Sequence, residues 1–168
     1  MNAKRLIKII LTLSFSTVLL IGCGNDSLNI PFSDLNFESS YEEMVKELGE
    51  PQDETSSYLG TSYCYESDYL VEGSEARYTF DDDENLASIS WIYESEDGEE
   101  ITAYYNDLHK QLVNKYGETT EATNDVTQLS DIWRLETGNI TLIALVSSEY
   151  NAVMYTYISP ENSTSATK

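Results

Sequence analysis

Cysteine and histidine are scarce in this chain of 168 residues, which has two cysteines, Cys23 and Cys64, and one histidine, His109. Clusters of Cys and His that hold zinc are therefore excluded. His109 follows the apolar stripe of a predicted helix by one position, so we expect it to face solvent. No Cys–His or Ser–His–Asp arrangement is supported around it. We predict no catalytic residue, no metal site and no cofactor, and thus a protein that is not an enzyme.

Basic residues are also few. Nine Lys and Arg stand against 30 Asp and Glu, which gives a formal net charge of −21 and a pI near 4.1. A surface of this sign repels nucleic acid and anionic lipid headgroups, so we expect neither as a partner. The charge suits solubility outside the cell, and it leaves room for a cationic partner.

Long hydrophobic runs are absent apart from the segment 9–21, IILTLSFSTVLLI. It follows three basic residues, Lys4, Arg5 and Lys8. Thirteen residues match the hydrophobic part of a signal peptide and fall short of the roughly 20 that a membrane-spanning helix needs. The segment therefore predicts a removable signal over residues 1–22.

The end of this segment and the two residues after it read Leu20, Ile21, Gly22 and Cys23, and they resemble the lipobox of bacterial prolipoproteins. The resemblance implies cleavage before Cys23 and attachment of a diacylglyceryl group to its thiol. The mature chain would then carry six basic and 30 acidic residues, a net charge of −24. It would be lipid-anchored on the extracytoplasmic side of the cell membrane, with the bilayer as its first partner.

Residues 23–36 are polar and contain Pro31, so we predict a lipidated N-terminus followed by a flexible tether. Residues 37–159 are enough for one compact domain, and 160–168 form a polar tail that we expect to be disordered. Cys64 has no cysteine partner once Cys23 carries lipid. We therefore expect a buried strand residue there rather than a nucleophile.

Two helices are predicted. Ser40 and Glu43 form a capping box, and an apolar stripe runs to Leu48 before Gly49 and Pro51. The second helix follows the acidic segment 96–100, which favours the positive end of a helix dipole, and it ends at Gly117. Its apolar face consists of Ile101, Tyr105, Leu108, Leu112 and Tyr116.

Strands are predicted by alternating patterns before and after the second helix. The sequence near Gly49 parallels that near Gly117, and both are followed by strands. We therefore predict an α+β fold, with two helices packed on one face of an antiparallel sheet and an α-βββ-α-βββ pseudo-repeat. The strand segments are 58–71, 76–80, 86–93, 129–136, 140–146 and 152–158.

The helix end YEEMVKELGEP (41–51), the Tyr-rich hairpin and FDDDENLASISW (80–91) resemble small lipoproteins of the SmpA/OmlA and β-lactamase-inhibitor-like group. The resemblance covers 37–91, and the second half only through its likeness to the first. It implies helices on an antiparallel sheet, no catalytic machinery and a role in binding proteins or scaffolding envelope assemblies. Glu38 and Ser39 replace the Gly-Met usual before the first helix, and no contact residues carry over.

The turn 81–85, DDDEN, has the alternate acids that open an EF-hand loop. Leu86 stands where that loop needs Gly, and Ile92 where it needs Glu. A hairpin turn is the better interpretation because Asp and Asn bond their own backbone in turns. Weak surface calcium binding stays open as an alternative.

The strand 140–146 is apolar on both sides, so a face away from the helices needs a cover as well. We expect Arg77, Arg134, Ile143 and Leu145 on that face and treat them as candidate partner-binding residues. Tyr, of which there are 13, and Trp are frequent in interface hot spots. Each arginine has an alternative, structural explanation, which is an ion pair with an acidic neighbour across the strands.

We therefore predict a lipid-anchored, non-enzymatic domain that binds an envelope or cell-surface protein. One alternative is a lipoprotein that binds a small ligand or a cation such as calcium. The other is a hydrolase that uses two carboxylates, which the many acids allow but do not specify.

Overall fold

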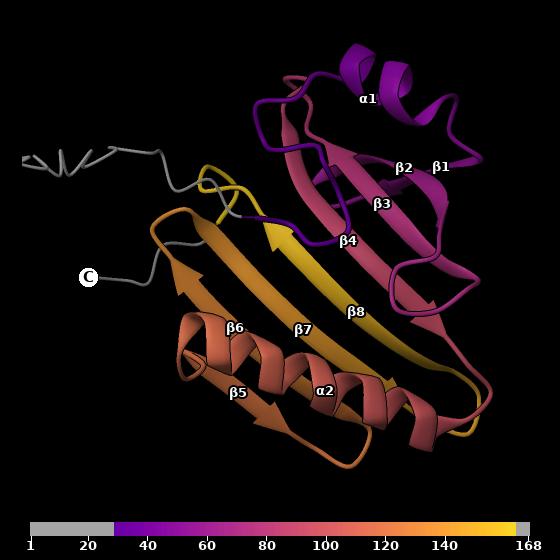
Figure 1. Ribbon diagram of the computed structural model, residues 1–168, viewed down its shortest axis with the longest axis vertical. Coiled ribbons are helices and arrows are strands. Elements are labelled where there is room, and N and C mark those ends of the chain that lie inside the picture. The colour runs from indigo at the N-terminus through magenta and orange to yellow at the C-terminus, as the bar shows by residue number, and fades with distance from the viewer. Residues whose placement is uncertain (1–28, 164–168) are drawn as a thin grey trace, which may run out of the picture.

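The computed structural model describes residues 29–163, which form a single antiparallel sheet and two helices (Figure 1). The predicted signal 1–22, its lipobox residues Leu20, Ile21 and Gly22, the lipid site Cys23 and the tail residues 164–168 lie outside the described residues. The elements in chain order are α1 (Tyr41–Leu48), β1 (Asp53–Ser57), β2 (Gly60–Ser67), β3 (Ser74–Phe80), β4 (Leu86–Glu94), α2 (Gly98–Tyr116), β5 (Glu121–Asn124), β6 (Gln128–Leu135), β7 (Gly138–Val146) and β8 (Asn151–Ile158).

The eight strands lie in the order β1-β2-β3-β4-β8-β7-β6-β5. Each half of the chain builds four neighbouring strands, and the two halves join where β4 pairs with β8. That pairing runs from Ser88 opposite Ile158 to Glu94 opposite Ala152. The two central strands thus come from opposite halves of the sequence, and the edges of the sheet are β1 and β5.

The first helix forms as its capping signals predict. The Ser40 side chain accepts a hydrogen bond from the Glu43 backbone N–H, and the Glu43 carboxylate accepts one from the Ser40 N–H, so the capping box is confirmed. The helix ends at Gly49, whose φ of +84° suits a residue without Cβ. Within α1 only Met44 is buried.

The second helix is the long one. Asp97 caps its first turn, and Gly117 follows its last residue with a φ of +85°. It buries Ile101, Tyr105, Leu108 and Leu112, as the sequence pattern predicts, and packs on β7 and β8. Neither helix of residues 29–163 is long and apolar enough to cross a membrane.

The predicted fold class is wrong. Each half contributes four strands rather than three, so the α-βββ-α-βββ order does not occur. The layout of two helices packed on one face does not occur either, because α1 is a two-turn helix at the margin of the sheet and only α2 lies along the strands (Figure 1). Residues 29–163 form a sheet of eight antiparallel strands with little helix.

The two missed strands explain why the predicted number of strands is wrong. β1 reads DETSS and β5 reads EATN, and every residue in both is exposed. A strand at the edge of a sheet that buries neither face shows no apolar alternation, and charged residues there discourage pairing with other chains. The sequence pattern therefore detects only the inner strands.

The segment 29–36 covers part of the sheet that α2 leaves open. Ile30 and Leu35 are each 5% exposed. The Phe32 ring lies 5.4 Å from the Tyr155 ring and 5.5 Å from the Tyr69 ring. The predicted tether 23–36 therefore packs on the domain from Asn29 onward.

The predicted tail 160–168 has its first residues beside the sheet. The Ser163 hydroxyl donates to the Ser159 carbonyl at 2.7 Å and accepts from the Asn139 N–H at 2.9 Å. These bonds hold residues 160–163 against the start of β7.

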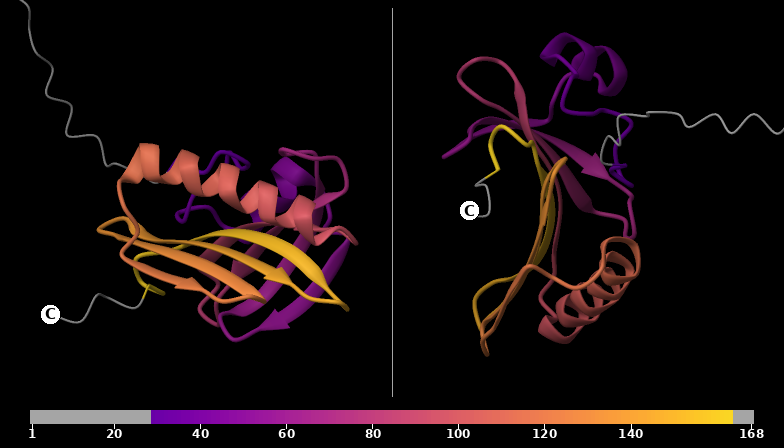
Figure 2. Two further views of the ribbon diagram at one scale, coloured as in Figure 1. Left: turned by 90° about the horizontal axis from the view of Figure 1, so that it is seen from below. Right: turned by 90° about the vertical axis from the view of Figure 1, so that its left-hand side faces the viewer.

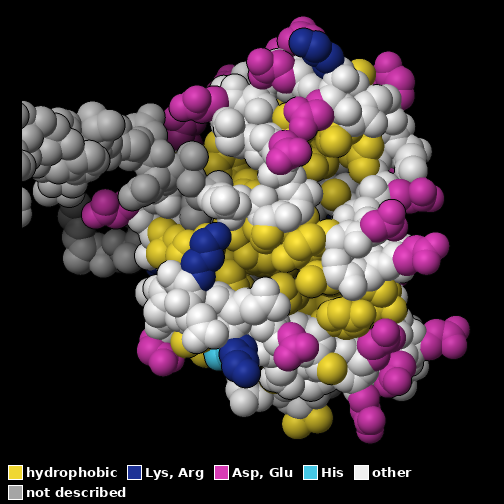
Figure 3. All heavy atoms as spheres, in the orientation of Figure 1, with side chains coloured by type: hydrophobic (Ala, Val, Ile, Leu, Met, Phe, Trp, Pro, Cys, Tyr) yellow, Lys and Arg dark blue, Asp and Glu magenta, His cyan; other side chains and the backbone are white. Residues whose placement is uncertain are grey.

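The sheet is curved. In both views of Figure 2 the sheet is convex on the side that carries α2 and concave on the opposite side. Hydrophobic side chains gather between α1 and α2 on the helix-bearing side (Figure 3), where segment 29–36 also lies. No helix among residues 29–163 covers the opposite, concave face, which we call the helix-free face.

Replacing Leu35 by Ala tests whether segment 29–36 belongs to the folded domain. We expect Leu35→Ala to lower the free energy of unfolding by about 2–4 kcal/mol because it removes a buried side chain. Leu48→Ala is the control: Leu48 is 38% exposed, and its replacement should cost less than about 1 kcal/mol. Urea denaturation of the chain from residue 23 with Cys23→Ser measures both. Equal, small losses would show that the segment contributes nothing.

Candidate functional site

The helix-free face is built from alternate residues of the strands, because successive side chains of a strand point to opposite sides. We assign to this face those residues of β2, β3, β4, β8, β7 and β6 that lie opposite one another in the strand pairing and point away from α2. They are mostly small hydroxyl residues and aliphatic residues: Ser62, Cys64, Glu75, Arg77, Thr79, Ser88, Ser90, Ile92, Met154, Thr156, Thr141, Ile143 and Ser130.

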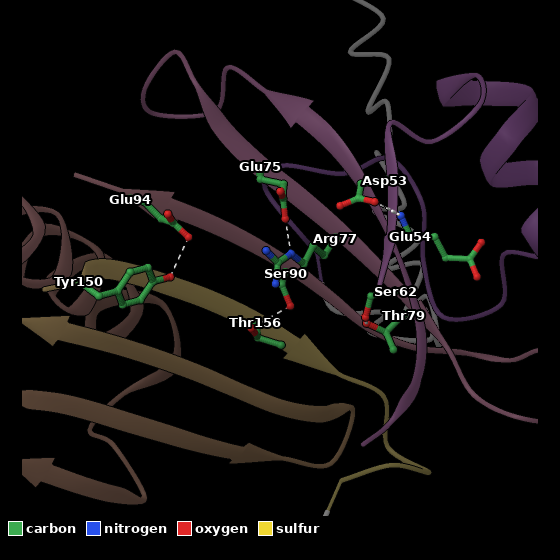
Figure 4. Close-up of polar contacts among 10 residues, drawn as sticks. All are labelled: Asp53, Glu54, Ser62, Glu75, Arg77, Thr79, Ser90, Glu94, Tyr150 and Thr156. Atoms are coloured by element: carbon green, nitrogen blue, oxygen red, sulfur yellow. Dashed lines mark hydrogen bonds and ion pairs between the residues drawn. The ribbon is translucent and has the colours of Figure 1, made fainter. Parts of the chain in front are cut away.

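Hydroxyl groups of this face bond one another across the strands. The Ser62 and Thr79 hydroxyls are 2.8 Å apart between β2 and β3. The Thr156 hydroxyl donates to that of Ser90 at 2.9 Å between β8 and β4 (Figure 4). These four hydroxyl groups are thus paired within the sheet and need no covering layer to pair them.

Arg77 lies near the middle of the face, on β3. Its Nε–H donates to the Glu75 carboxylate on the same strand (Figure 4). Burial lowers the pKa of the guanidinium, but the hydrogen bond and charge of Glu75 outweigh it and raise the pKa overall. The side chain is 36% exposed, so a charged group remains accessible.

A second polar pair stands beside Arg77. The Tyr150 hydroxyl donates to the Glu94 carboxylate at 2.8 Å. Burial, followed by the hydrogen bond and charge of Glu94, raises the pKa of Tyr150 to about 12, and the nearby Arg77 charge opposes the rise. The phenol is therefore neutral and acts as a donor at physiological pH.

An apolar row crosses the same face. Ile92 on β4, Met154 on β8 and Ile143 on β7 are in register. Met154 and Ile143 are half-buried, and Leu145 lies two residues further along β7, opposite Ala152. Two of the predicted binding residues, Ile143 and Leu145, thus lie in or next to one aliphatic patch.

The two arginines are not brought together. Arg134 lies on β6, where its guanidinium donates to the Glu121 carboxylate of edge strand β5 at 2.9 Å. Four strand spacings of about 4.8 Å separate β3 from β6, so Arg77 and Arg134 are roughly 20 Å apart. Arg134 has an acidic partner across the strands, as the alternative explanation requires, whereas the partner of Arg77, Glu75, lies on the same strand. The candidate residues span a wide surface rather than a pocket.

Cys64 is buried at 3% exposure on β2, opposite Arg77. Burial, followed by the charge of Glu75, raises the pKa of its thiol. A raised pKa leaves little thiolate at neutral pH, so this environment does not activate a nucleophile.

The sequence prediction missed a polar cluster on the other face. Asp131 on β6 is 4% exposed and accepts hydrogen bonds from the Tyr105 hydroxyl and from His109 Nδ1, the latter at 2.7 Å. The His109 side chain is 39% exposed, so it faces solvent only in part. Burial and Asp131 raise the pKa of Tyr105. The sequence signal for this cluster is Asp131 itself, an acidic residue at an alternating position between Leu129 and Trp133, whose side chains point toward the core.

The acidic segment 81–85 forms a hairpin turn. Asp81 Oδ1 accepts from the backbone N–H groups of Asp83 and Asn85, at 3.0 and 2.9 Å. Glu84 takes a positive φ of 64°. The described part of the chain contains no group of three or more His, Cys, Asp or Glu side chains placed to share a metal ion.

Comparison with known proteins gives a fold neighbour but no family. No family model and no curated protein matches the sequence. The crystal structure of a DUF4309 family protein, YjgB from Bacillus subtilis subsp. subtilis str. 168, is similar with a TM-score of 0.50 and 10% identity. The match covers 73% of this chain and 79% of that one. At this identity the likeness shows the fold alone.

The reactivity of Cys64 tests the geometry of the face. We expect native Cys64 to react with a thiol reagent at pH 8 at least about tenfold more slowly than in the unfolded chain, because its pKa is raised and the side chain is buried. The rate should climb as the pH increases. Val126→Cys in a Cys64→Ser background supplies an exposed reference, since Val126 is 94% exposed. Equal rates at both positions would contradict the buried placement.

Proposed function

We propose that the chain is a lipid-anchored, extracytoplasmic, non-enzymatic domain that binds another envelope or cell-surface protein through its helix-free face. The observation that carries the proposal is the row of Ile92, Met154 and Ile143 beside the Arg77–Glu75 pair. An aliphatic patch next to an accessible charged group, on a face that no described helix covers, is the composition of a protein interface.

The dimensions of the face fit a protein better than a small ligand. Eight strands at about 4.8 Å spacing and strands of about eight residues give a surface of roughly 34 by 26 Å. A standard interface buries about 800 Å² on each partner, which this surface accommodates. Small-molecule sites are concave pockets that enclose most of the ligand. The candidate residues instead spread over some 20 Å of sheet.

The lipid anchor rests on Cys23 and the three residues before it. Two acyl chains on one residue hold a protein firmly at a bilayer, whereas one holds it only marginally. Anchoring would place the domain outside the cytoplasm without any membrane-spanning helix.

Cys23→Ser should release the protein from membranes. Removal of the acylated residue abolishes the only firm membrane attachment that we propose. Fractionation of cells into membrane and soluble parts measures the effect, and Cys64→Ser, which alters the other cysteine, should leave the protein in the membrane fraction. Retention of the Cys23→Ser protein on membranes would refute the anchor.

Ile143→Asp should abolish partner binding. A photoreactive residue at Thr141, on the same face, should give a crosslinked adduct with one protein in intact cells. We expect Ile143→Asp to lower the adduct yield about tenfold or more, because a charge buried in an apolar contact lacks a partner. Arg134→Glu should also lower it.

Val126→Asp is the matched control, because it makes the same kind of change on a fully exposed turn. Its adduct yield should equal that of the unmodified protein. An adduct that persists unchanged in both Ile143→Asp and Arg134→Glu would rule out this face as the binding site.

A further inference from the structure

Segment 29–36 fixes where the chain leaves the domain toward its anchor. The Lys115 ammonium donates to the Asn29 carbonyl at 3.2 Å, next to the last turn of α2. Ile30 and Leu35 are buried, and the Phe32 ring lies 6.1 Å from that of Tyr157. Because these side chains belong to the hydrophobic core, Asn29 is held at the C-terminal end of α2.

The connection from there to the lipid is short. Five residues, 24–28, separate Cys23 from Asn29. At about 3.4 Å per residue they span at most about 20 Å in any conformation. Asn29 therefore cannot lie further than about 20 Å from a lipidated Cys23.

We infer that the end of the domain formed by the C-terminus of α2 faces the bilayer surface, and that the β5–β6 turn points away from it. This inference rests on the lipid anchor proposed above. Trp133 Nε1 donates to the Gly117 carbonyl at 2.9 Å, so the end of β6 lies at the membrane-facing end. Val126 precedes the start of β6, and it lies roughly 23 Å from Trp133 along that strand.

The orientation determines what kind of partner the helix-free face meets. The strands run between the end that holds the C-terminus of α2 and the opposite end (Figure 1). With the first of these ends at the bilayer, the helix-free face would stand along the membrane normal. A connection of at most about 20 Å and strands of about 25 Å keep the whole face within roughly 45 Å of the bilayer. At this height the face can meet a protein that is itself embedded in or anchored to the same membrane, which is the class of partner that the inferred orientation favours.

Charge along α2 agrees with this arrangement. The segment before α2 and its first turn carry Glu96, Asp97, Glu99 and Glu100, whereas Lys110 and Lys115 lie in its second half. The strongly acidic end of the helix is thus the one directed away from the lipid headgroups.

Fluorescence quenching by lipid headgroups tests the orientation. The full-length lipidated protein is placed in phosphatidylcholine vesicles that contain a small fraction of lipid with a nitroxide headgroup. One fluorophore is attached at Glu118→Cys, just beyond α2, or at Val126→Cys, both exposed, in a Cys64→Ser background. Because the labels differ by about a strand length in height, we expect at least about threefold stronger quenching at position 118.

Equal quenching, or stronger quenching at 126, in protein that floats with the vesicles would overturn the orientation and leave the anchor standing. Lipidated protein that fails to float would overturn the anchor and the orientation together. A Gly/Ser spacer of about twenty residues inserted after Gly24 is the control. It should reduce the difference between the two labels. A difference that survives the spacer would show that the short connection does not orient the domain.

Discussion

The pairing of β4 with β8 is the interaction on which the rest of the structure depends. It joins strands from opposite halves of the chain along seven residue pairs, from Ser88–Ile158 to Glu94–Ala152. Trp91 and Tyr157, both fully buried, lie on these strands and form the centre of the core. Without this pairing each half would be a four-stranded sheet with an unprotected inner edge, and α2 would lose β8, one of the two strands on which it packs.

Once the strands are paired, the two faces of the sheet differ in how they are stabilised. The inner face is covered by α2 and by segment 29–36, which bury large side chains such as Leu108 and Leu35. The other face relies on short side chains that bond across the strands, as Ser62 does with Thr79. One face therefore supplies the stability, and the other stays open for contact.

The sequence predicts those elements whose side chains enter the core. The capping box at Ser40 and the apolar stripe of α2 are visible because they repeat at helical spacing. The edge strands β1 and β5 bury nothing, so no pattern reveals them, and the predicted number of strands is wrong for that reason. Segment 29–36 packs through residues at irregular spacing. Asp131 pairs with Tyr105 and His109, which are 26 and 22 positions away, and such contacts depend on the strand register.

The way in which the helix-free face satisfies its own polar groups bears on how it binds. A partner that covers hydroxyls already bonded to each other does not have to replace those bonds, so the cost of removing water is low. Under the proposed function, affinity would come mainly from the apolar area at the row of Met154 and Ile143. Arg77 keeps a charge that is paired with Glu75 yet accessible. A partner with a mismatched charge at this position would bind less tightly, because of repulsion or the cost of desolvation. Under the proposed function, binding strength and partner choice would therefore depend on different strands of the same sheet.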